Sequence, residues 1–168
     1  MEFGRAIAED LPQLKAVFRA IVDDMHRRRI NIWNDFYPTA FFEDDIGQKR
    51  LYVLKEEDII VSAFVLCESN EGEAAVRWSC AARRPLYLDR FGVHVGYAGK
   101  GIGSFMLKKA AETAKNMGAD HLRLFVVDVN RPAIGLYEKN GFLKAAGVYD
   151  EWINDVLVLH EYGYEKKI

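Results

Sequence analysis

Residues 98–107 read AGKGIGSFML, and this stretch raises the question of what such a turn binds. Glycines occupy positions 99, 101 and 103, and an apolar pattern of helical spacing follows directly. Glycine is used where the backbone takes a positive φ or approaches another group closely. The N-terminus of a helix carries unpaired N–H groups and a partial positive charge. The stretch therefore predicts an anion site, most simply a cradle for a phosphate group.

The glycine spacing departs from two common phosphate-binding motifs. A dinucleotide-binding fingerprint needs G-x-G-x-x-G, whereas here the spacing is G-x-G-x-G and Ser104 follows. Asp128 stands where that fingerprint places an acid, so a dinucleotide-binding fragment stays open as an alternative. A P-loop is excluded, because Lys100 is followed by Gly101 and not by Ser or Thr. From the turn alone, a plain strand-to-helix connection is an equally good interpretation.

The composition is that of a globular protein. The chain has 168 residues, of which 50% are hydrophobic and 29% charged, so we expect a single domain over residues 1–168. A net charge of −2 argues against a nucleic-acid partner. Cys67 and Cys80 have neither metal-ligand nor disulfide-framework spacing, and we expect buried thiols in a reducing compartment and no metal.

The hydropathy of the chain indicates a cytoplasmic protein that does not interact with membranes. The first residues, MEFGRAIAEDLPQL, contain acids and lack the apolar core of a signal peptide. No apolar run approaches the ~20 residues needed to span a bilayer.

Hydrophobic periodicity predicts an α/β domain with one mixed sheet covered by helices. Asp10 is expected to cap the first helix with Gln13 as its capping-box partner, and Gly92 to mark a bulge. Gly118 and Gly141 are expected to follow helix ends. The predicted helices are 11–28, 39–47, 103–117 and one beginning at Asn130 or Arg131; the predicted strands are 2–7, 50–54, 59–67, 73–80, 86–95, 121–127, 142–148 and 153–160.

A second motif extends the interpretation of the glycine turn. Residues 130–142 read NRPAIGLYEKNGF, and residues 93–103 read VHVGYAGKGIG. In this order, joined by a helix and a strand, the two segments resemble the GNAT superfamily of N-acetyltransferases. The first resembles the family's pyrophosphate loop, [QR]-x-x-G-x-[GA], with Ala98 in place of the opening Gln or Arg. The second resembles the N-x-x-A-x-x-x-Y-E-x-x-G-F block and matches it at Asn130, Ala133, Tyr137, Glu138, Gly141 and Phe142.

The resemblance implies a fold and a cosubstrate. The implied fold is a central mixed, mostly antiparallel sheet with a splayed parallel strand pair, flanked by about four helices. Acetyl-CoA is the implied cosubstrate: the 98–104 loop binds its pyrophosphate, and backbone near Val93 and Val95 pairs with the pantetheine arm and supplies an oxyanion donor. The implied coenzyme A residues are Phe91, Val93, Val95, Ala98, Gly99, Lys100, Gly101, Ile102, Gly103, Ser104, Asn130, Ala133 and Tyr137.

The implied reaction is acetyl transfer to a primary amine by direct attack on the thioester. Tyr137 is the implied general acid to the coenzyme A thiolate. Asp89 is our first candidate for the general base, and a water chain is the alternative to any side chain. Asn130 is as good a helix N-cap as a cofactor ligand. The other base candidates are His94, Glu151 and Tyr87.

The sequence says less about the acceptor, which we expect to be a small-molecule or peptide amine bound by a monomer or homodimer. A non-catalytic acyl-CoA-binding or regulatory module of the same fold is the alternative function. Candidate pocket aromatics are Trp33, Phe36, Tyr37, Trp78 and Tyr149. The acids that would favour a cationic amine are Glu43, Asp44, Asp45, Asp150 and Glu151.

Overall fold

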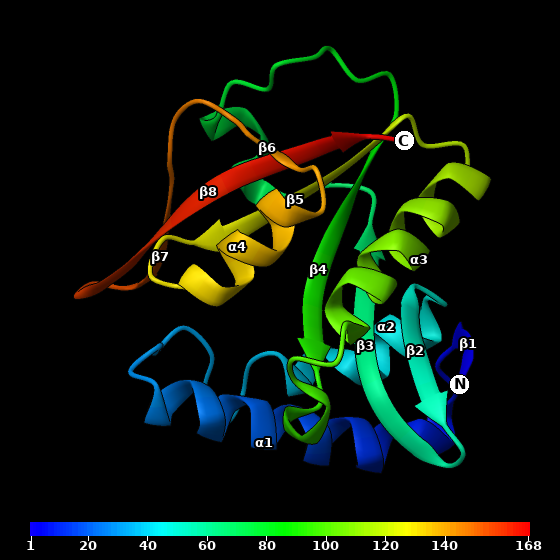
Figure 1. The fold of residues 1–168 in the computed structure, drawn as a ribbon. Helices are drawn as coiled ribbons and strands as arrows, with labels where there is room; N and C mark the ends of the chain where they lie inside the picture. Colours follow the sequence, from blue (N-terminus) through cyan, green and yellow to red (C-terminus); the bar gives the residue numbers. More distant parts are fainter. The chain divides into compact units, whose positions relative to one another are not determined.

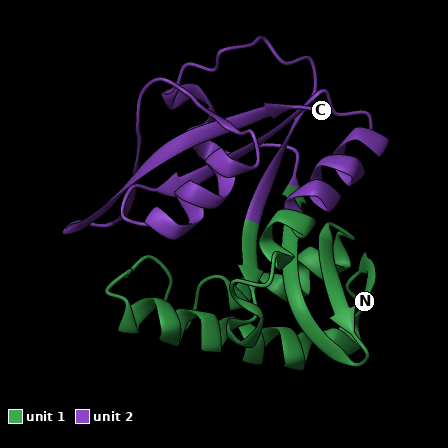
Figure 2. Ribbon diagram, in the orientation of Figure 1, with its two compact units in different colours: residues 1–66, 90–106 green, residues 67–89, 107–168 purple.

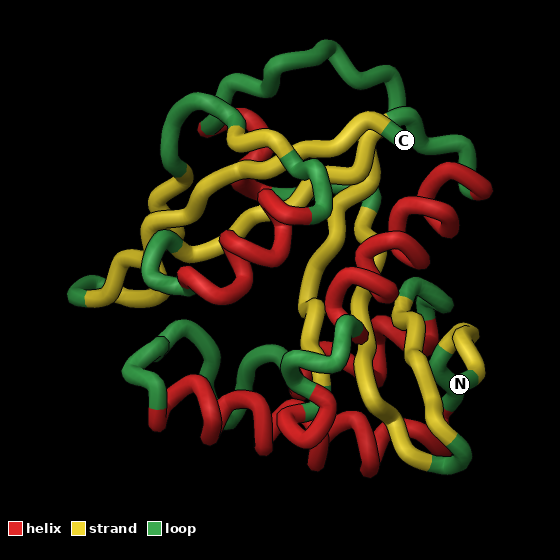
Figure 3. The backbone as a smooth tube through the Cα atoms, in the orientation of Figure 1, coloured by secondary structure: helices red, strands yellow, loops and turns green.

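Eight strands and four α-helices, with four short 3₁₀ turns, make up the fold (Figures 1 and 3). The computed structural model describes all residues from 1 to 168. The strands are β1 (Glu2–Arg5), β2 (Leu51–Glu56), β3 (Ile59–Cys67), β4 (Pro85–Val93), β5 (His121–Val127), β6 (Leu143–Lys144), β7 (Tyr149–Asn154) and β8 (Leu157–Lys167). The helices are α1 (Leu11–Arg27), α2 (Phe42–Gly47), α3 (Ile102–Asn116) and α4 (Arg131–Lys139), and the 3₁₀ turns are η1 (Ala8–Asp10), η2 (Thr39–Phe41), η3 (Glu71–Ala75) and η4 (Val95–Tyr97).

The chain divides into two compact units, which Figure 2 shows in different colours. Unit 1 comprises residues 1–66 and 90–106, and unit 2 comprises residues 67–89 and 107–168. The division falls inside β4 and inside α3, so both elements contribute to both units. The expectation of a single domain over residues 1–168 stays a prediction.

Unit 1 is built on an antiparallel sheet in the order β1-β2-β3, with the end of β4 beside β3. Ser62 Oγ of β3 donates a 2.6 Å hydrogen bond to the Gly92 carbonyl of β4, and the His94 amide donates to the Val61 carbonyl at 2.9 Å. The sheet also buries apolar side chains, and each fully buried aliphatic or aromatic side chain contributes about 1.5–3 kcal/mol to folding. As its periodicity predicts, α1 buries one apolar side, formed by Leu14, Val17, Phe18 and Val22.

Unit 2 contains the parallel strand pair. Strand β4 pairs with β5 from Pro85↔His121 to Leu88↔Leu124, and β8 pairs antiparallel with β5, β6 and β7. The parallel register ends there, although β5 continues to Val127. Helix α4 packs on this sheet through Tyr137, whose ring centroid lies 6.5 Å from that of Tyr164 on β8. The predicted mixed, mostly antiparallel α/β fold with one parallel strand pair and four helices is confirmed.

Strand β4 is irregular at Arg90, two residues before the predicted bulge at Gly92, which stays a prediction. Arg90 has a φ of 47°, in the left-handed region, whereas Gly92 does not. Glycine is required at 92 for another reason. An added Cβ would lie 2.8 Å from the Phe18 ring and 2.9 Å from Ile21, because α1 approaches the β4 backbone closely.

The strand predicted at residues 73–80 is also wrong. Residues 71–75 form η3, and only an isolated bridge joins Arg77 to Ala146. The apolar side chains of this segment cover the sheet of unit 2 and do not extend it. Trp78 lies 5.6 Å from Phe125 between ring centroids, and its indole N–H donates to the Glu73 carbonyl at 3.1 Å.

The last strands of the chain cover different residues from those predicted. In place of strands at 142–148 and 153–160, the chain forms the short β6, then β7 and β8. Gly147 interrupts the first predicted strand with a φ of 103°. The Asn154 side chain accepts 3.0 Å hydrogen bonds from the Val156 and Leu157 amides, which places a turn inside the second.

The predicted helix ends agree with the structure in most places. Gly118 and Gly141 have φ values of 85° and 80°, as glycines after helix C-termini do. Asn130 caps α4, and its side chain accepts a hydrogen bond from the Ala133 amide. The Asp10–Gln13 capping box is wrong, because the Asp10 carboxylate accepts from the Ile7 amide and Gln13 donates to the Asp58 carbonyl. None of the helices combines the length and hydropathy that crossing a bilayer requires.

A buried ion pair fixes Arg90 in unit 1. Its guanidinium donates to both Asp45 carboxylate oxygens, at 2.8 and 3.0 Å, and Arg50 donates to the same carboxylate at 2.6 Å. The Asp45 side chain is 0% exposed and that of Arg90 8%. Asp45 therefore serves the packing of α2 against β4, and the expectation that it favours a cationic acceptor is wrong.

We predict that Asp45→Asn lowers the free energy of unfolding by about 3–5 kcal/mol, because it removes the carboxylate that pairs with the buried Arg90 charge. Asp24→Asn, which removes the partner of the exposed Arg27 and Arg28, should cost at most about 1 kcal/mol. Denaturant unfolding of both variants measures the difference. Equal stability losses would show that the Asp45–Arg90 pair contributes no more than a surface pair.

Candidate active site

The glycine turn is an exposed loop of unit 1 that leads into α3. Gly99 and Gly101 have φ values of 75° and 82°, and an added Cβ at either would meet nothing within 4 Å. Conformation, not lack of space, requires glycine at both positions. Ala98, Gly99, Lys100 and Gly101 are exposed, Gly103 and Ser104 are half-buried, and Ile102 is buried.

The loop is attached to the sheet of unit 1 through Tyr97. Its hydroxyl donates a 2.6 Å hydrogen bond to Glu56 at the end of β2. The Lys100 ammonium lies 4.8 Å from the Tyr97 ring centroid. The amides of Ala98 and Lys100 donate back into the turn, at 3.3 and 3.4 Å. The Phe105 amide donates to the Gly101 carbonyl at 3.1 Å where α3 begins, and the N-terminus of a helix is where backbone N–H groups bind anions.

The end of β4 and the turn after it supply the remaining candidates of unit 1. Phe91 and Val93 are half-buried, and Val95 in η4 is 37% exposed. His94, a base candidate, uses its ring Nδ1 to accept a hydrogen bond from the Gly96 amide at 3.0 Å. This contact gives His94 a local capping role.

Tyr137 lies in unit 2, on the side of α4 that faces the sheet. Its side chain is 7% exposed and packs on Phe142 and Tyr164, with ring centroids 5.9 and 6.5 Å away. Burial, and to a lesser degree the nearby Asp89 carboxylate, raises the pKa of Tyr137. The phenol therefore stays protonated at neutral pH and is a donor. Ala133, one turn earlier, is half-buried.

Three carboxyl groups of unit 2 act on one another. Burial, with smaller contributions from the charges of Glu151 and Asp89, raises the pKa of Glu161 to about 8. Burial and the charges of Asp89 and Glu71 also raise the pKa of Glu151. The structure thus brings together two of the predicted base candidates, Asp89 and Glu151. It adds Glu161, which the sequence interpretation missed because only the strand register reveals its neighbours.

Tyr87, the remaining base candidate, belongs to a buried network. Burial raises its pKa to about 12, and its hydroxyl lies 3.5 Å from Arg123 Nη1. Arg123 also donates to Glu165 at 3.3 Å and stacks on Trp78, with Cζ 4.2 Å from the ring centroid. Glu165 accepts 2.6 Å hydrogen bonds from the amide and hydroxyl of Ser79. These contacts hold the segment after η3 on the sheet, so Tyr87 and Trp78 have structural partners.

The candidate acceptor-site residues belong to both units. Trp33 and Tyr37 pack together in unit 1, with ring centroids 6.2 Å apart, and Phe36 packs on Phe41. In unit 2, Tyr149 packs on Phe125 at 5.9 Å. The remaining acids have these positions: Glu43 is exposed, Asp44 pairs with Arg50 at 3.1 Å, and Asp150 pairs with His160 at 2.6 Å.

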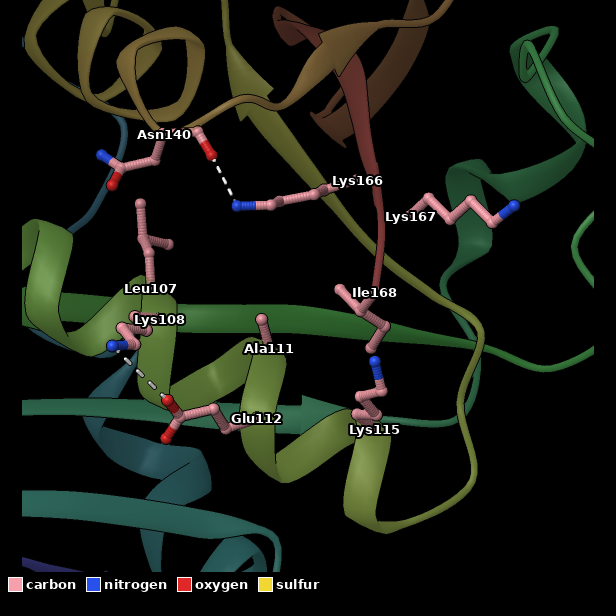
Figure 4. Close-up of a pocket in the computed structure, with 9 residues that line it drawn as sticks. All are labelled: Leu107, Lys108, Ala111, Glu112, Lys115, Asn140, Lys166, Lys167 and Ile168. Carbon is pink, nitrogen blue, oxygen red and sulfur yellow. Dashed lines mark hydrogen bonds and ion pairs between the residues drawn. The ribbon is translucent and has the colours of Figure 1, made fainter.

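A shallow cavity of unit 2 contains none of the predicted site residues. Figure 4 shows it between α3 and the C-terminal residues, with Asn140 at one side. Lys166 closes that side by donating a 2.8 Å hydrogen bond to the Asn140 carbonyl. The lining residues are Leu107, Lys108, Ala111, Glu112, Lys115, Asn140, Lys166, Lys167 and Ile168. The cavity is therefore separate from the tyrosine and the carboxyl groups described above.

Known proteins resemble this chain in sequence and in fold. Streptothricin acetyltransferase of Streptomyces lavendulae is 38% identical over 104 residues, which cover 60% of this chain and 54% of the relative. Thialysine N-epsilon-acetyltransferase of Bos taurus is 45% identical over 58 residues, 34% of each chain. The chain thus spans about half or less of the length of these two relatives.

Solved structures share the fold over the whole length. The PaiA N-acetyltransferase of Thermoplasma acidophilum, solved in complex with coenzyme A, superposes with a TM-score of 0.70 at 20% identity, covering 99% of this chain and 98% of that one. The acetyltransferase (GNAT) family model matches residues 18–142. This segment holds the glycine loop, the parallel strand pair and the Asn130–Phe142 block, so the chain belongs to the GNAT family of acetyltransferases.

Proposed function

We propose that this protein transfers an acetyl group from acetyl-CoA to a primary amine. The observation that carries the proposal is the loop with two left-handed glycines ahead of α3, in a member of the GNAT family. The relatives named above are acetyltransferases, and one structural neighbour holds coenzyme A. The acceptor is a small-molecule or peptide amine.

The loop binds the pyrophosphate of the cosubstrate. Positive φ at Gly99 and Gly101 turns the chain so that backbone amides gather at the N-terminus of α3. The helix dipole adds partial positive charge at that end. Lys100 supplies a full charge nearby and compensates for Ala98, which stands where the family motif has Gln or Arg. Ile102, Gly103 and Ser104 form the first turn and complete the cradle.

The end of β4 binds the pantetheine arm and the thioester. The His94 amide donates to β3, and successive N–H groups of an extended chain point to opposite edges. The Val93 amide therefore points away from β3, where an added peptide-like arm can pair with it. An amide in this position stabilises the oxyanion that forms on amine attack, an effect of about 3–4 kcal/mol in acyl-transfer enzymes. Phe91 and Val95 flank this amide.

Tyr137 protonates the sulfur that leaves. Its raised pKa keeps the phenol neutral, so it donates a hydrogen bond, and then a proton, to the coenzyme A thiolate. Asn130 and Ala133 begin the same helix, and the small Ala133 side chain lets the cofactor approach it. Asp89 is near enough to Tyr137 to affect its pKa and belongs to the acid–base system of the reaction.

We predict that Tyr137→Phe lowers kcat by about 10²–10⁴-fold while the affinity for coenzyme A changes little, because the ring stays and only the proton donor is lost. Tyr52→Phe, which removes the hydroxyl of a buried tyrosine of β2, is the matched control and should keep kcat. Thiol release from acetyl-CoA gives the rate, and calorimetry gives the affinity. An unchanged rate in Tyr137→Phe would remove Tyr137 from its role.

A second prediction concerns the loop. Gly101→Ala should weaken coenzyme A binding at least tenfold, because alanine resists a φ of 82° and the amides then lose their arrangement. Gly47→Ala is the matched control: its Cβ would also meet nothing within 4 Å, but its φ is not in the left-handed region. Calorimetry with coenzyme A measures both variants. Equal affinities would show that the cradle lies elsewhere.

The activity itself is tested by thiol release from acetyl-CoA with a panel of amines, amino acids, peptides and aminoglycosides. We expect at least one acceptor to be acetylated, with the product identified by mass spectrometry. Tight coenzyme A binding with no turnover on any acceptor would instead support the non-catalytic acyl-CoA-binding module.

A further inference from the structure

Ser62 is a buried polar residue of β3, in unit 1. Its side chain is 0% exposed, and its neighbours Val61 and Ala63 are buried as well. A hydroxyl in such surroundings is unfavourable unless it forms a hydrogen bond. Strands β3 and β4 are neighbours in the sheet (Figure 1), and Ser62 Oγ donates a 2.6 Å hydrogen bond to the Gly92 carbonyl of β4. The side chain of one strand therefore acts on the backbone of the next.

The Gly92 carbonyl and the Val93 amide are the two ends of one peptide group. This group is planar and conjugated, so charge drawn toward its oxygen makes its N–H a better hydrogen-bond donor. The contact from Ser62 is buried, and its 2.6 Å distance lies near the short end of the usual range for O–H···O bonds, about 2.5–3.0 Å. Both conditions strengthen the polarisation. Ser62 thus acts on the Val93 amide without touching it.

The hydroxyl, the carbonyl and the amide are aligned across β4. The peptide bond between Gly92 and Val93 is trans, so its C=O and N–H point in opposite directions. Its oxygen points to Ser62 of β3, and the next amide, that of His94, also donates to β3, at the Val61 carbonyl. The Val93 N–H therefore points away from β3. This is the direction in which the proposed function places the thioester oxygen.

The backbone around this peptide group is held from three sides. On one side, α1 packs so closely that a Cβ at position 92 would lie 2.8 Å from the Phe18 ring. Before it, the Arg90 guanidinium donates to both oxygens of the buried Asp45 carboxylate. After it, the His94 amide is bonded to β3. A donor that is fixed before the reaction stabilises developing charge without having to reorganise.

We propose that Ser62 is a positioning residue for acetyl transfer, which holds and polarises the Gly92–Val93 peptide so that the Val93 amide binds the oxyanion more strongly. This inference rests on the proposed function and deepens it. Ser62 itself contacts neither the thioester nor the amine, and its hydroxyl keeps its proton throughout the reaction. It acts through the Gly92 carbonyl alone.

The contribution of Ser62 appears in turnover and not in cofactor affinity. The thioester oxygen carries more negative charge in the transition state than in the bound substrate, so a better donor lowers the barrier selectively. Removal of one oxyanion donor costs about 10²–10³-fold in kcat. A neighbouring hydrogen bond strengthens such a contact by about 10–30%, so loss of the Ser62 hydroxyl should lower kcat by about 2–8-fold.

The first test measures kcat and affinity separately. Ser62→Ala should lower kcat by about 2–8-fold, as thiol release from acetyl-CoA shows, and should leave the affinity for coenzyme A unchanged in calorimetry. Ser79→Ala is the matched control, because its hydroxyl also donates a 2.6 Å hydrogen bond, but to Glu165 in unit 2; it should keep kcat. A folded Ser62→Ala with wild-type kcat would overturn the inference.

The second test replaces the hydroxyl by a weaker donor. Ser62→Cys keeps a hydrogen on a side chain of similar length, and a thiol donates more weakly than a hydroxyl. We expect a kcat between those of the wild type and Ser62→Ala. If Ser62→Cys and Ser62→Ala lose equal activity, donation to the Gly92 carbonyl does not control the rate. Melting temperatures of both variants separate this effect from a loss of stability.

The third test detects the polarisation without turnover. The amide proton resonance of Val93 is measured by NMR in the protein without substrate. Ser62→Ala should move it upfield, Ser62→Cys should move it less, and Ser79→Ala should leave it in place, because the Gly92 carbonyl alone links the hydroxyl to this amide. A Ser62→Ala protein with an unchanged Val93 resonance, and a lower melting temperature only, would show that Ser62 has a purely structural role.

Failure of this inference and failure of acetyl transfer give different results. If amines are acetylated at equal rates by the wild type and Ser62→Ala, the proposed function stands and the role of Ser62 is wrong. If no amine releases thiol, acetyl transfer fails, and the catalytic role of Ser62 fails with it. The Val93 resonance then still shows whether Ser62 polarises the peptide.

Discussion

The parallel pairing of β4 and β5 ends at Leu88 and Leu124, and the chemistry of the fold depends on that limit. Asp89 follows Leu88 on β4, at the point where β4 no longer pairs with β5. The next residue, Arg90, takes a φ of 47° and gives its guanidinium to a fully buried carboxylate. A left-handed conformation in a residue with a side chain persists only where the surroundings determine it. The ion pair with Asp45 holds Arg90 in this conformation. A buried charge of unit 1 therefore helps to fix the direction of the backbone that continues to the glycine loop.

Burial raises the pKa of a phenol and of a carboxyl group in unit 2. Burial next to a carboxylate keeps a phenol protonated, which suits a donor to a thiolate. Burial among carboxylates makes one carboxyl group basic enough to take a proton near neutral pH. Burial is the largest cause of both shifts, and neighbouring carboxylates add to it. An arginine at this end of the sheet would lower both pKa values.

The sequence predicted the local features of the fold well, because these depend on short-range chemistry. The left-handed glycines at 99 and 101, the Asn130 cap and the helix stop at Gly118 follow from conformational preferences of single residues. Residues 73–80 show where this fails: their apolar side chains pack on the face of a sheet, and only the tertiary structure distinguishes that from a strand. Glu161 was missed for a related reason. Its neighbours Tyr149 and Glu151 become visible only once the register of β7 and β8 is known.

The contact between α1 and β4 couples amino-acid substitutions at positions that are far apart in the sequence. The Phe18 ring and Ile21 occupy the space that a side chain at position 92 would need. A methyl group gained at 92 requires both the Phe18 ring and the Ile21 side chain to shift or to become smaller. These positions are therefore expected to co-vary among descendants of one ancestor, and the order in which the substitutions arise is constrained as well.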